Sequence, residues 1–272
     1  MICGVGRKQM PRAGLRYIVL VITLTQCGRL RSVLQPESAP ASVRVLSYSL
    51  YGSDARYTQG AVANAQLYKH VYPGWRMRVY YDSSVPETVL QTIGAHGVEL
   101  INFTGSKLNK MTWRFLAISD LHVDVFCSRD IDSRLSLRER IAVEEWLKSG
   151  KMFHVMRDHP SHSNFAMSGG MWCARSQVIL KIEMLLERAA LNEDYLKDMD
   201  FLNSDIWPLA KTDVLQHDSF SCKKFGAKPF PIPRVGVEHV GSVYVDGEMR
   251  KVDVDILRKS LRDNNQSYTT CD

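Results

Sequence analysis

Segments with the patterns of strands and of helices alternate along the first half of this chain, and this alternation constrains the fold more than any other feature. Apolar runs of strand length and helical patterns take turns at residues 43–50, 59–70, 77–81, 86–94, 98–103, 110–121 and 123–127. Strands that alternate with helices form a parallel sheet covered on both faces. The sequence therefore predicts an α/β fold with a mostly parallel sheet flanked by helices, in one catalytic domain over residues 43–272.

The N-terminal segment differs from the rest of the chain in charge. Residues 1–31 hold six of the 35 Lys and Arg residues and none of the 29 Asp and Glu residues, so the remainder is neutral. An apolar run at 17–25 follows the basic residues, which is typical of a signal peptide or a short signal anchor, here predicted over 1–28. A buried strand with basic flanks is the alternative. Residues 29–42 are rich in Pro, Ser and Ala, which predicts a linker.

These features predict that the chain enters the secretory pathway, either held by a membrane tether or secreted. Glycosylation sequons begin at Asn102 and Asn265. Four cysteines follow the predicted leader and allow three pairings, which the sequence leaves open: Cys127, Cys173, Cys222 and Cys271. A neutral domain offers no basic footprint, so we expect no nucleic-acid partner.

Two aspartates, Asp130 and Asp132, directly follow the strand predicted at 123–127, and a capping box at 136–139 then begins a helix. Ligands of open parallel sheets bind outside the carboxyl ends of the strands. Two carboxylates this close repel each other unless a proton or a divalent cation lies between them, and an exposed strand end favours Mg²⁺ or Mn²⁺. In the alternative interpretation, Asp130 pairs with Arg129 or Arg134 and Asp132 caps the helix.

A second polar cluster spans residues 156–172. Arg157 and His159 offer donors to hydroxyl or phosphate oxygens, and Gly169 and Gly170 allow a backbone to approach a ligand closely. The cluster therefore predicts a binding loop. A turn around Pro160 is the structural alternative, and zinc is disfavoured because two histidines without further ligands do not complete a zinc site.

The C-terminal half adds a third group of acids and imidazoles. Asp200 could act as general base on an acceptor hydroxyl, and His217 could complete a divalent-metal site. His239 is an alternative metal ligand. Each of these residues could equally be an ordinary surface or capping residue.

Taken in order, the motifs resemble those of nucleotide-sugar-dependent glycosyltransferases of the GT-A type. More narrowly, they resemble a group with the motifs Arg-Asp-x-Asp-Ser, Met-Arg-Asp-His-Pro, Gly-Gly-Met-Trp and His-Asp-Ser, which start here at Arg129, Met156, Gly169 and His217. The segment Trp113-Arg114-Phe115 also fits the group. The resemblance covers about residues 43–244.

This resemblance implies a GT-A-like Rossmann-type domain in which Asp130, Asp132 and His217 hold Mn²⁺ or Mg²⁺ against the donor diphosphate. It implies Asp200 and Asp158 as catalytic residues, and the donor-binding residues Arg114, Arg129, Asp130, Asp132, Arg157, His159, Gly169 and Gly170. The chain departs from the group at Cys173, where glycine is usual, and at Phe201, where glutamine is usual.

The predicted function is transfer of a sugar from a nucleotide-sugar donor to a hydroxyl acceptor such as a glycan, by an enzyme that is tethered in the Golgi lumen or secreted. Two alternatives are a catalytically inactive GT-A-like module that binds a glycan or a partner, and a haloacid-dehalogenase-like phosphatase. The phosphatase fits less well because that family expects threonine or valine where Arg134 stands and usually opens its fold with the Asp-x-Asp strand.

Overall fold

A computed structural model describes residues 42–176, 178–189 and 197–263. The predicted leader, nearly all of the predicted linker, Asn265 and Cys271 lie outside the described residues. Among the helices that are described, none combines the length and the apolar character that crossing a membrane requires.

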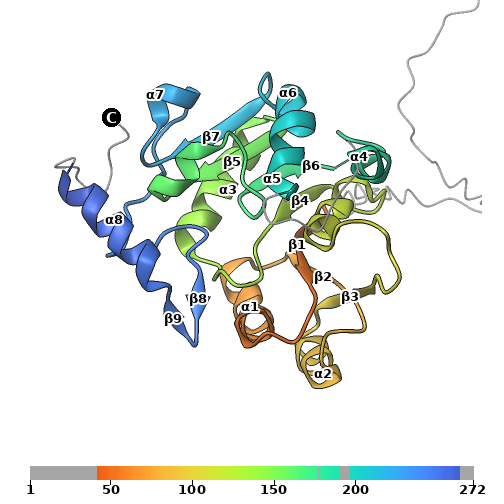
Figure 1. Cartoon of the computed structure of the whole chain (residues 1–272). Helices are drawn as coiled ribbons and strands as arrows, with labels where there is room; N and C mark the ends of the chain where they lie inside the picture. The colour runs from red at the N-terminus through yellow and green to blue at the C-terminus, as the bar shows by residue number, and fades with distance from the viewer. Residues whose placement is uncertain (1–41, 177, 190–196, 264–272) are drawn as a thin grey trace, which may run out of the picture. The chain divides into compact units, whose positions relative to one another are not determined.

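A seven-stranded sheet organises the domain (Figure 1), in the order β3-β2-β1-β4-β6-β5-β7. Its strands are β1 (Arg44–Leu50), β2 (Arg76–Tyr81), β3 (Glu99–Asn102), β4 (Val125–Ser128), β5 (Phe153–Arg157), β6 (Trp172–Arg175) and β7 (Val214–Asp218). The first four are parallel, β6 is antiparallel to both of its neighbours, and β5 is parallel to β7. The predicted α/β class with a mostly parallel sheet flanked by helices is confirmed.

Each face of the sheet has its own core, because successive side chains of a strand point to opposite faces. On β4, Val125 and Cys127 belong to one core and Phe126 to the other. The first core is covered by α1 (Ala55–Val71), α2 (Glu87–Ala95) and α3 (Leu137–Ser149). The second is covered by the 3₁₀ helix η1 (Lys110–Ser119), α4 (Ile182–Arg188), α5 (Lys197–Phe201), the π-helix η3 (Leu202–Ile206) and α6 (Trp207–Ala210).

The remaining elements lie around this sandwich. They are the 3₁₀ helix η2 (Pro160–Asn164), α7 (Cys222–Phe225), β8 (Tyr244–Val245), β9 (Glu248–Met249) and α8 (Lys251–Asp263). The hairpin of β8 and β9 lies beside α1 and leads into α8 (Figure 1).

A disulfide joins the two central strands, since Cys127 of β4 and Cys173 of β6 are register partners and are covalently bonded. The structure thus has one of the bonds that the four cysteines allow. It also gives Cys173, the position where the resembled group has glycine, a bond to the strand that precedes the two aspartates.

Apolar residues at helical spacing from Val178 onward predict a helix over residues 176–190, but α4 begins only at Ile182. Ser119 at the end of η1 donates a hydrogen bond to the carbonyl of Ile179 (2.6 Å) and accepts one from the amide of Ile182 (3.1 Å). The hydroxyl thus takes the place of a helical partner for these backbone groups. The strand β7 was also missed, because its polar residues Gln216, His217 and Asp218 mask the strand pattern.

The chain order around β1 creates a crevice. From β1 the chain proceeds outward to β2 and β3 and then returns to the opposite side of β1 to form β4. Loops that leave β1 and β4 therefore diverge at their carboxyl ends, which is where open α/β sheets bind ligands.

Candidate active site

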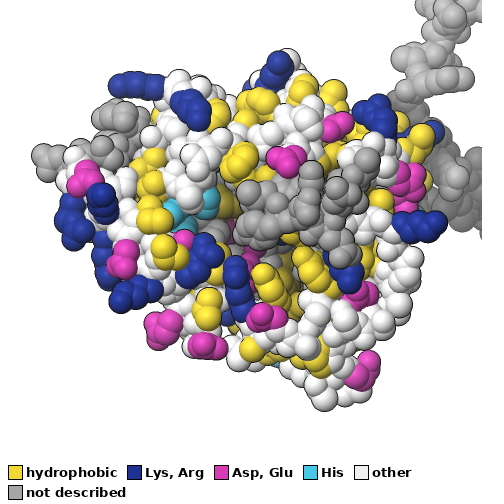
Figure 2. Space-filling view, viewed as in Figure 1, with side chains coloured by type: hydrophobic (Ala, Val, Ile, Leu, Met, Phe, Trp, Pro, Cys, Tyr) yellow, Lys and Arg dark blue, Asp and Glu magenta, His cyan; other side chains and the backbone are white. Residues whose placement is uncertain are grey.

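A pocket of about 400 Å³ lies at the carboxyl ends of β1 and β4. Within the described part of the chain, three acids and three arginines line it: Asp130, Asp132, Asp198, Arg56, Arg114 and Arg250. Over the face drawn in Figure 2, Lys and Arg side chains are interspersed with Asp and Glu side chains. Among the described residues, this face carries no large region of a single charge, whereas the pocket gathers acids and arginines in one place.

Helix α1 holds the turn that carries the two aspartates. Asn64 donates hydrogen bonds to the carbonyls of Ile131 (3.1 Å) and Ser133 (2.8 Å) and accepts one from the amide of Leu135 (3.3 Å). Gly60 lies against the same backbone, and a Cβ there would stand only 3.0 Å from the carbonyl carbon of Ile131 and closer still to its oxygen. The turn is thus fixed by two residues that sequence reasoning did not single out.

Each aspartate of the pair contacts a different arginine. Arg114 of η1 forms ion pairs with Asp130 and with Asp198, the latter at 2.7 Å. Arg56, in the first turn of α1, donates from Nε to Asp132 at 2.7 Å. Asp130 therefore pairs with Arg114, and not with Arg129 or Arg134 as in the structural alternative considered from the sequence.

Burial and nearby negative charge disfavour the charged form of Asp132 and Asp198. The pKa of Asp132 lies above its ordinary value because of burial and the nearby charge of Asp130, although Arg56 acts against both. Burial also raises the pKa of Asp198, against the effect of Arg114. Negative charge is thus incompletely compensated here, and a bound cation would relieve the repulsion.

The two predicted glycines lie against these acids. A Cβ on Gly170 would come within 2.6 Å of the backbone nitrogen of Asp130, and closer to its carboxylate. A Cβ on Gly169 would collide with the carboxylate of Asp198 and the guanidinium of Arg114. The hydroxyl of Ser128 donates to the carbonyl of Gly169 at 2.7 Å, which ties the glycine turn to the end of β4.

Asp200, the predicted general base, is exposed on α5 and does not line the pocket, whereas Asp198 does. Residues two apart on a helix point to nearly opposite sides. Asp198 precedes the buried residues Phe201 and Leu202 by three and four positions, so it shares their inward face. That spacing was available in the sequence and would have favoured Asp198.

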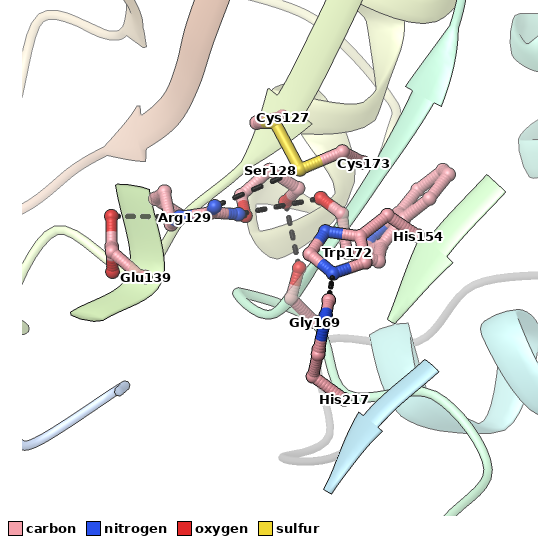
Figure 3. Close-up of a disulfide and its surroundings, with 9 residues drawn as sticks. All are labelled: Cys127, Ser128, Arg129, Glu139, His154, Gly169, Trp172, Cys173 and His217. Atoms are coloured by element: carbon pink, nitrogen blue, oxygen red, sulfur yellow. Dashed lines mark hydrogen bonds and ion pairs between the residues drawn. A yellow bond between two sulfur atoms is a disulfide. The ribbon is translucent and has the colours of Figure 1, made fainter. Parts of the chain in front are cut away.

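Arg129, predicted to bind the donor, is buried and absent from the pocket lining, and its side chain extends towards Glu139 of α3 (Figure 3). It forms an ion pair with Glu139 at 3.4 Å and donates to the carbonyls of Ser128 (2.7 Å) and Trp172 (3.4 Å). Both charged side chains are only 2% exposed. Arg129 lies two residues after Cys127 and continues its face of the strand, so the structure assigns it a packing role.

Arg157 is likewise absent from the pocket lining. Register pairs Arg157 on β5 with Asp218 on β7, and Arg157 donates from Nε to the carboxylate at 2.7 Å, with both side chains fully buried. The Met-Arg-Asp-His-Pro and His-Asp-Ser motifs therefore contact each other across adjacent strands.

Asp158 and His159 are buried outside the pocket as well. Asp158 accepts hydrogen bonds from Arg138 (2.9 and 3.0 Å), Arg234 (2.6 Å) and the amide of Val240 (2.9 Å). Burial opposes its charge, but Arg234 and Arg138 lower its pKa overall. The Nε2 atom of His159 lies 3.0 Å from the carbonyl of Asp253. These contacts give Asp158 a structural role in joining the C-terminal segment to β5.

His217 is not brought to the aspartates. Its Nδ1 lies 2.8 Å from Nε2 of His154 (Figure 3). Its Nε2 lies 3.2 Å from the carboxylate of Glu145 on α3. The alternative ligand His239 packs its ring against those of His159 and His162, with centroids 4.7 and 5.9 Å apart. Across the described ranges, no three His, Cys, Asp or Glu side chains are arranged to hold a metal ion.

Comparisons with known proteins give only distant likenesses. No family model and no curated protein matches the chain. Glucosyl-3-phosphoglycerate synthase from Mycobacterium tuberculosis is 12% identical with a TM-score of 0.42, over 64% of this chain and 68% of that one. An active-site mutant of LgtC is 14% identical with a TM-score of 0.42, over 66% and 75%. A cytidylyltransferase from Leptospira borgpetersenii is 13% identical with a TM-score of 0.41, over 83% and 98%.

Proposed function

We propose that this chain is a GT-A-like glycosyltransferase that transfers a sugar from a nucleotide-sugar donor to a hydroxyl acceptor. One observation carries the proposal: Asp130 and Asp132 line a pocket at the carboxyl ends of β1 and β4, where the chain order reverses. Likenesses as distant as those above carry no weight here, so the support comes from the side chains of the pocket.

The carboxylate pair fits a divalent cation in the chemistry of its donors. Mg²⁺ and Mn²⁺ bind to oxygen ligands, commonly one or two carboxylates together with substrate phosphates. Asp130 and Asp132 would hold such an ion, which when bound would supply stabilisation of the charge on the departing nucleotide. No third protein ligand is required in this arrangement, which agrees with the position of His217 beside α3.

The other residues of the pocket would orient the substrates. Arg114 joins Asp130 to Asp198 and so fixes the two carboxylates relative to each other. In the transfer, the bond from the anomeric carbon to the nucleotide oxygen breaks, the nucleoside diphosphate leaves with the electron pair, and the acceptor oxygen bonds to the anomeric carbon as its hydroxyl loses a proton. We assign to Asp198, and not to the exposed Asp200, the carboxylate that faces these reacting atoms.

We also propose that the enzyme acts in the lumen of the secretory pathway. The disulfide between Cys127 and Cys173 supports this, because disulfides persist mainly in oxidising compartments. Asn102 is exposed at the end of β3 and is accessible to glycosylation. Loss of an N-glycan from the expressed chain on Asn102→Gln would support the proposal, and a chain found unglycosylated in the cytosol would contradict it.

The catalytic proposal is tested by nucleotide binding to the full chain. Nucleoside diphosphates and nucleotide sugars are added with and without Mn²⁺, and the midpoint of thermal unfolding is followed. We expect a Mn²⁺-dependent rise with one nucleotide, its loss in Asp132→Asn, and its retention in Asp213→Asn, a surface aspartate paired with Lys151. Equal nucleotide binding by Asp132→Asn would refute the metal site, and binding without release of nucleoside diphosphate from the sugar donor would indicate an inactive module.

A further inference from the structure

The two arginines that contact the aspartate pair, Arg114 and Arg56, are held in different ways. We propose that Arg56 is a displaceable counter-ion, which holds Asp132 until a divalent cation takes that carboxylate and then binds the diphosphate of the nucleotide donor. This inference rests on the proposed function and deepens it, because it assigns a second, phosphate-binding role to a residue of the same pocket.

Arg114 cannot leave its position easily. Its side chain is 9% exposed, and it contacts the carboxylates of Asp130 and Asp198 together with the carbonyl of Arg129 at 3.3 Å. If a cation took Asp130, Asp198 would still hold the guanidinium. Arg114 is thus a fixed part of the pocket.

Arg56 is far less constrained. Its side chain is 27% exposed, and Asp132 is the carboxylate that it contacts among the described residues. Its guanidinium also lies 5.1 Å from the centre of the Tyr57 ring, which is a weak cation–π contact. A long side chain with one ionic partner at the rim of a pocket can exchange that partner at small cost.

A divalent cation and Arg56 compete for the same atoms. Arg56 donates to Oδ2 of Asp132, and that side chain is only 7% exposed, so little carboxylate surface remains for a second cation. The doubly charged ion also neutralises Asp130, whose negative charge repels that of Asp132. The divalent ion therefore wins this competition when both carboxylates bind it.

A displaced Arg56 would remain close to the donor phosphates. Arg56 and Arg250 line the same pocket, and Arg250 is anchored to Asp253 of α8 at 2.8 Å. A guanidinium offers a planar fork of donors that matches two phosphate oxygens. Once released from Asp132, the guanidinium of Arg56 becomes available to bind a phosphate, whereas that of Arg250 stays paired with Asp253.

The proposal predicts effects of opposite sign from one substitution, Arg56→Gln. Mn²⁺ alone, measured on the full chain by electron paramagnetic resonance of the free ion, should bind about tenfold more tightly because its competitor is gone. A nucleoside diphosphate, measured calorimetrically at saturating Mn²⁺, should bind about tenfold more weakly because a phosphate ligand is lost.

The control is Arg76→Gln. It removes an exposed arginine of β2 that pairs with Glu99 of β3, and it should change neither affinity. Unchanged or weaker Mn²⁺ binding by Arg56→Gln would show that Arg56 does not compete for Asp132. Unchanged nucleotide binding would show that it does not bind phosphate.

A parallel Asp132→Asn variant separates this inference from the proposed function. If Asp132→Asn abolishes Mn²⁺-dependent nucleotide binding while Arg56→Gln changes nothing, the inference about Arg56 fails and the proposed function stands. If Asp132→Asn binds Mn²⁺ and nucleotide like the parent, the metal site itself is refuted.

Discussion

Replacing Gly170 by alanine tests the geometry of the pocket with a single methyl group. Gly170 does not have a positive φ, so close packing, and not backbone conformation, requires glycine there. An added Cβ would lie 2.6 Å from the backbone nitrogen of Asp130, whereas real Cβ atoms do not come closer than about 3.0 Å to other heavy atoms. The carboxylate of Asp130 can swing away, but its backbone, held at the end of a central strand, cannot.

The expected cost follows from this conflict. Overpacking a well-packed site typically destabilises by about 1–3 kcal/mol. In domains of 150–250 residues, each kcal/mol lowers the unfolding midpoint by about 2–4 °C. The displaced Asp130 would also lose its place beside Asp132, so Mn²⁺-dependent nucleotide binding should be lost even well below the unfolding temperature.

Gly94→Ala is the matched control, because a Cβ at Gly94 in α2 would meet only Leu100, at an ordinary 3.6 Å. Alanine in a helix is favoured over glycine by about 0.5–1 kcal/mol, so this variant should be slightly more stable than the parent. Both variants are compared by thermal unfolding and nucleotide titration. A Gly170→Ala protein with the parent's midpoint and the parent's affinity would refute the proposed packing of the glycine turn on Asp130.

Two further predictions concern buried charge. Glu139→Gln leaves Arg129 buried without a counter-ion and should cost about 3–5 kcal/mol in urea unfolding, whereas an unchanged midpoint would show that the pair is not needed. Acid should also destabilise the fold through its buried histidines. Burial lowers the pKa of His217 to about 4 from 6.5, so the unfolded chain binds a proton first as the pH falls. The free energy of unfolding should hold above about pH 6.5 and decline towards pH 4, by about 3 kcal/mol for His217, and His217→Gln should flatten this decline.

Local pattern was sufficient to predict the first four strands of the sheet and the place of the aspartate pair in it. The alternation of strand-like and helix-like apolar patterns marks β1 to β4 and the helices between them. The capping box at Ser136 begins α3 as predicted, and the Ser136 hydroxyl accepts a hydrogen bond from the amide of Glu139 at 3.3 Å. A strand followed at once by a capped helix leaves only a short turn between them. The position of Asp130 and Asp132 at the carboxyl end of a central strand follows from that turn.

Local pattern could not predict the partners of the other polar residues, because these lie on strands that are distant along the chain. Register alone joins Arg157 to Asp218, and the alternation of faces after Cys127 sends Arg129 into the core. In the sequence both arginines look like ligands for phosphate. Only the pairing of β5 with β7 and the packing of α3 show that Arg157 and Arg129 already form ion pairs within the protein.

The sequence by itself determined the fold class and the position of the acids at the carboxyl end of a central strand. Both follow from apolar residues that recur every two or every 3.6 positions, a pattern that neighbouring residues encode. Tertiary structure decided which charged groups face the pocket. Arg56 reaches Asp132 across 76 residues of chain and Arg114 reaches Asp198 across 84. Contacts of that range arise from how the helices pack on the two faces of the sheet, and no local pattern carries them.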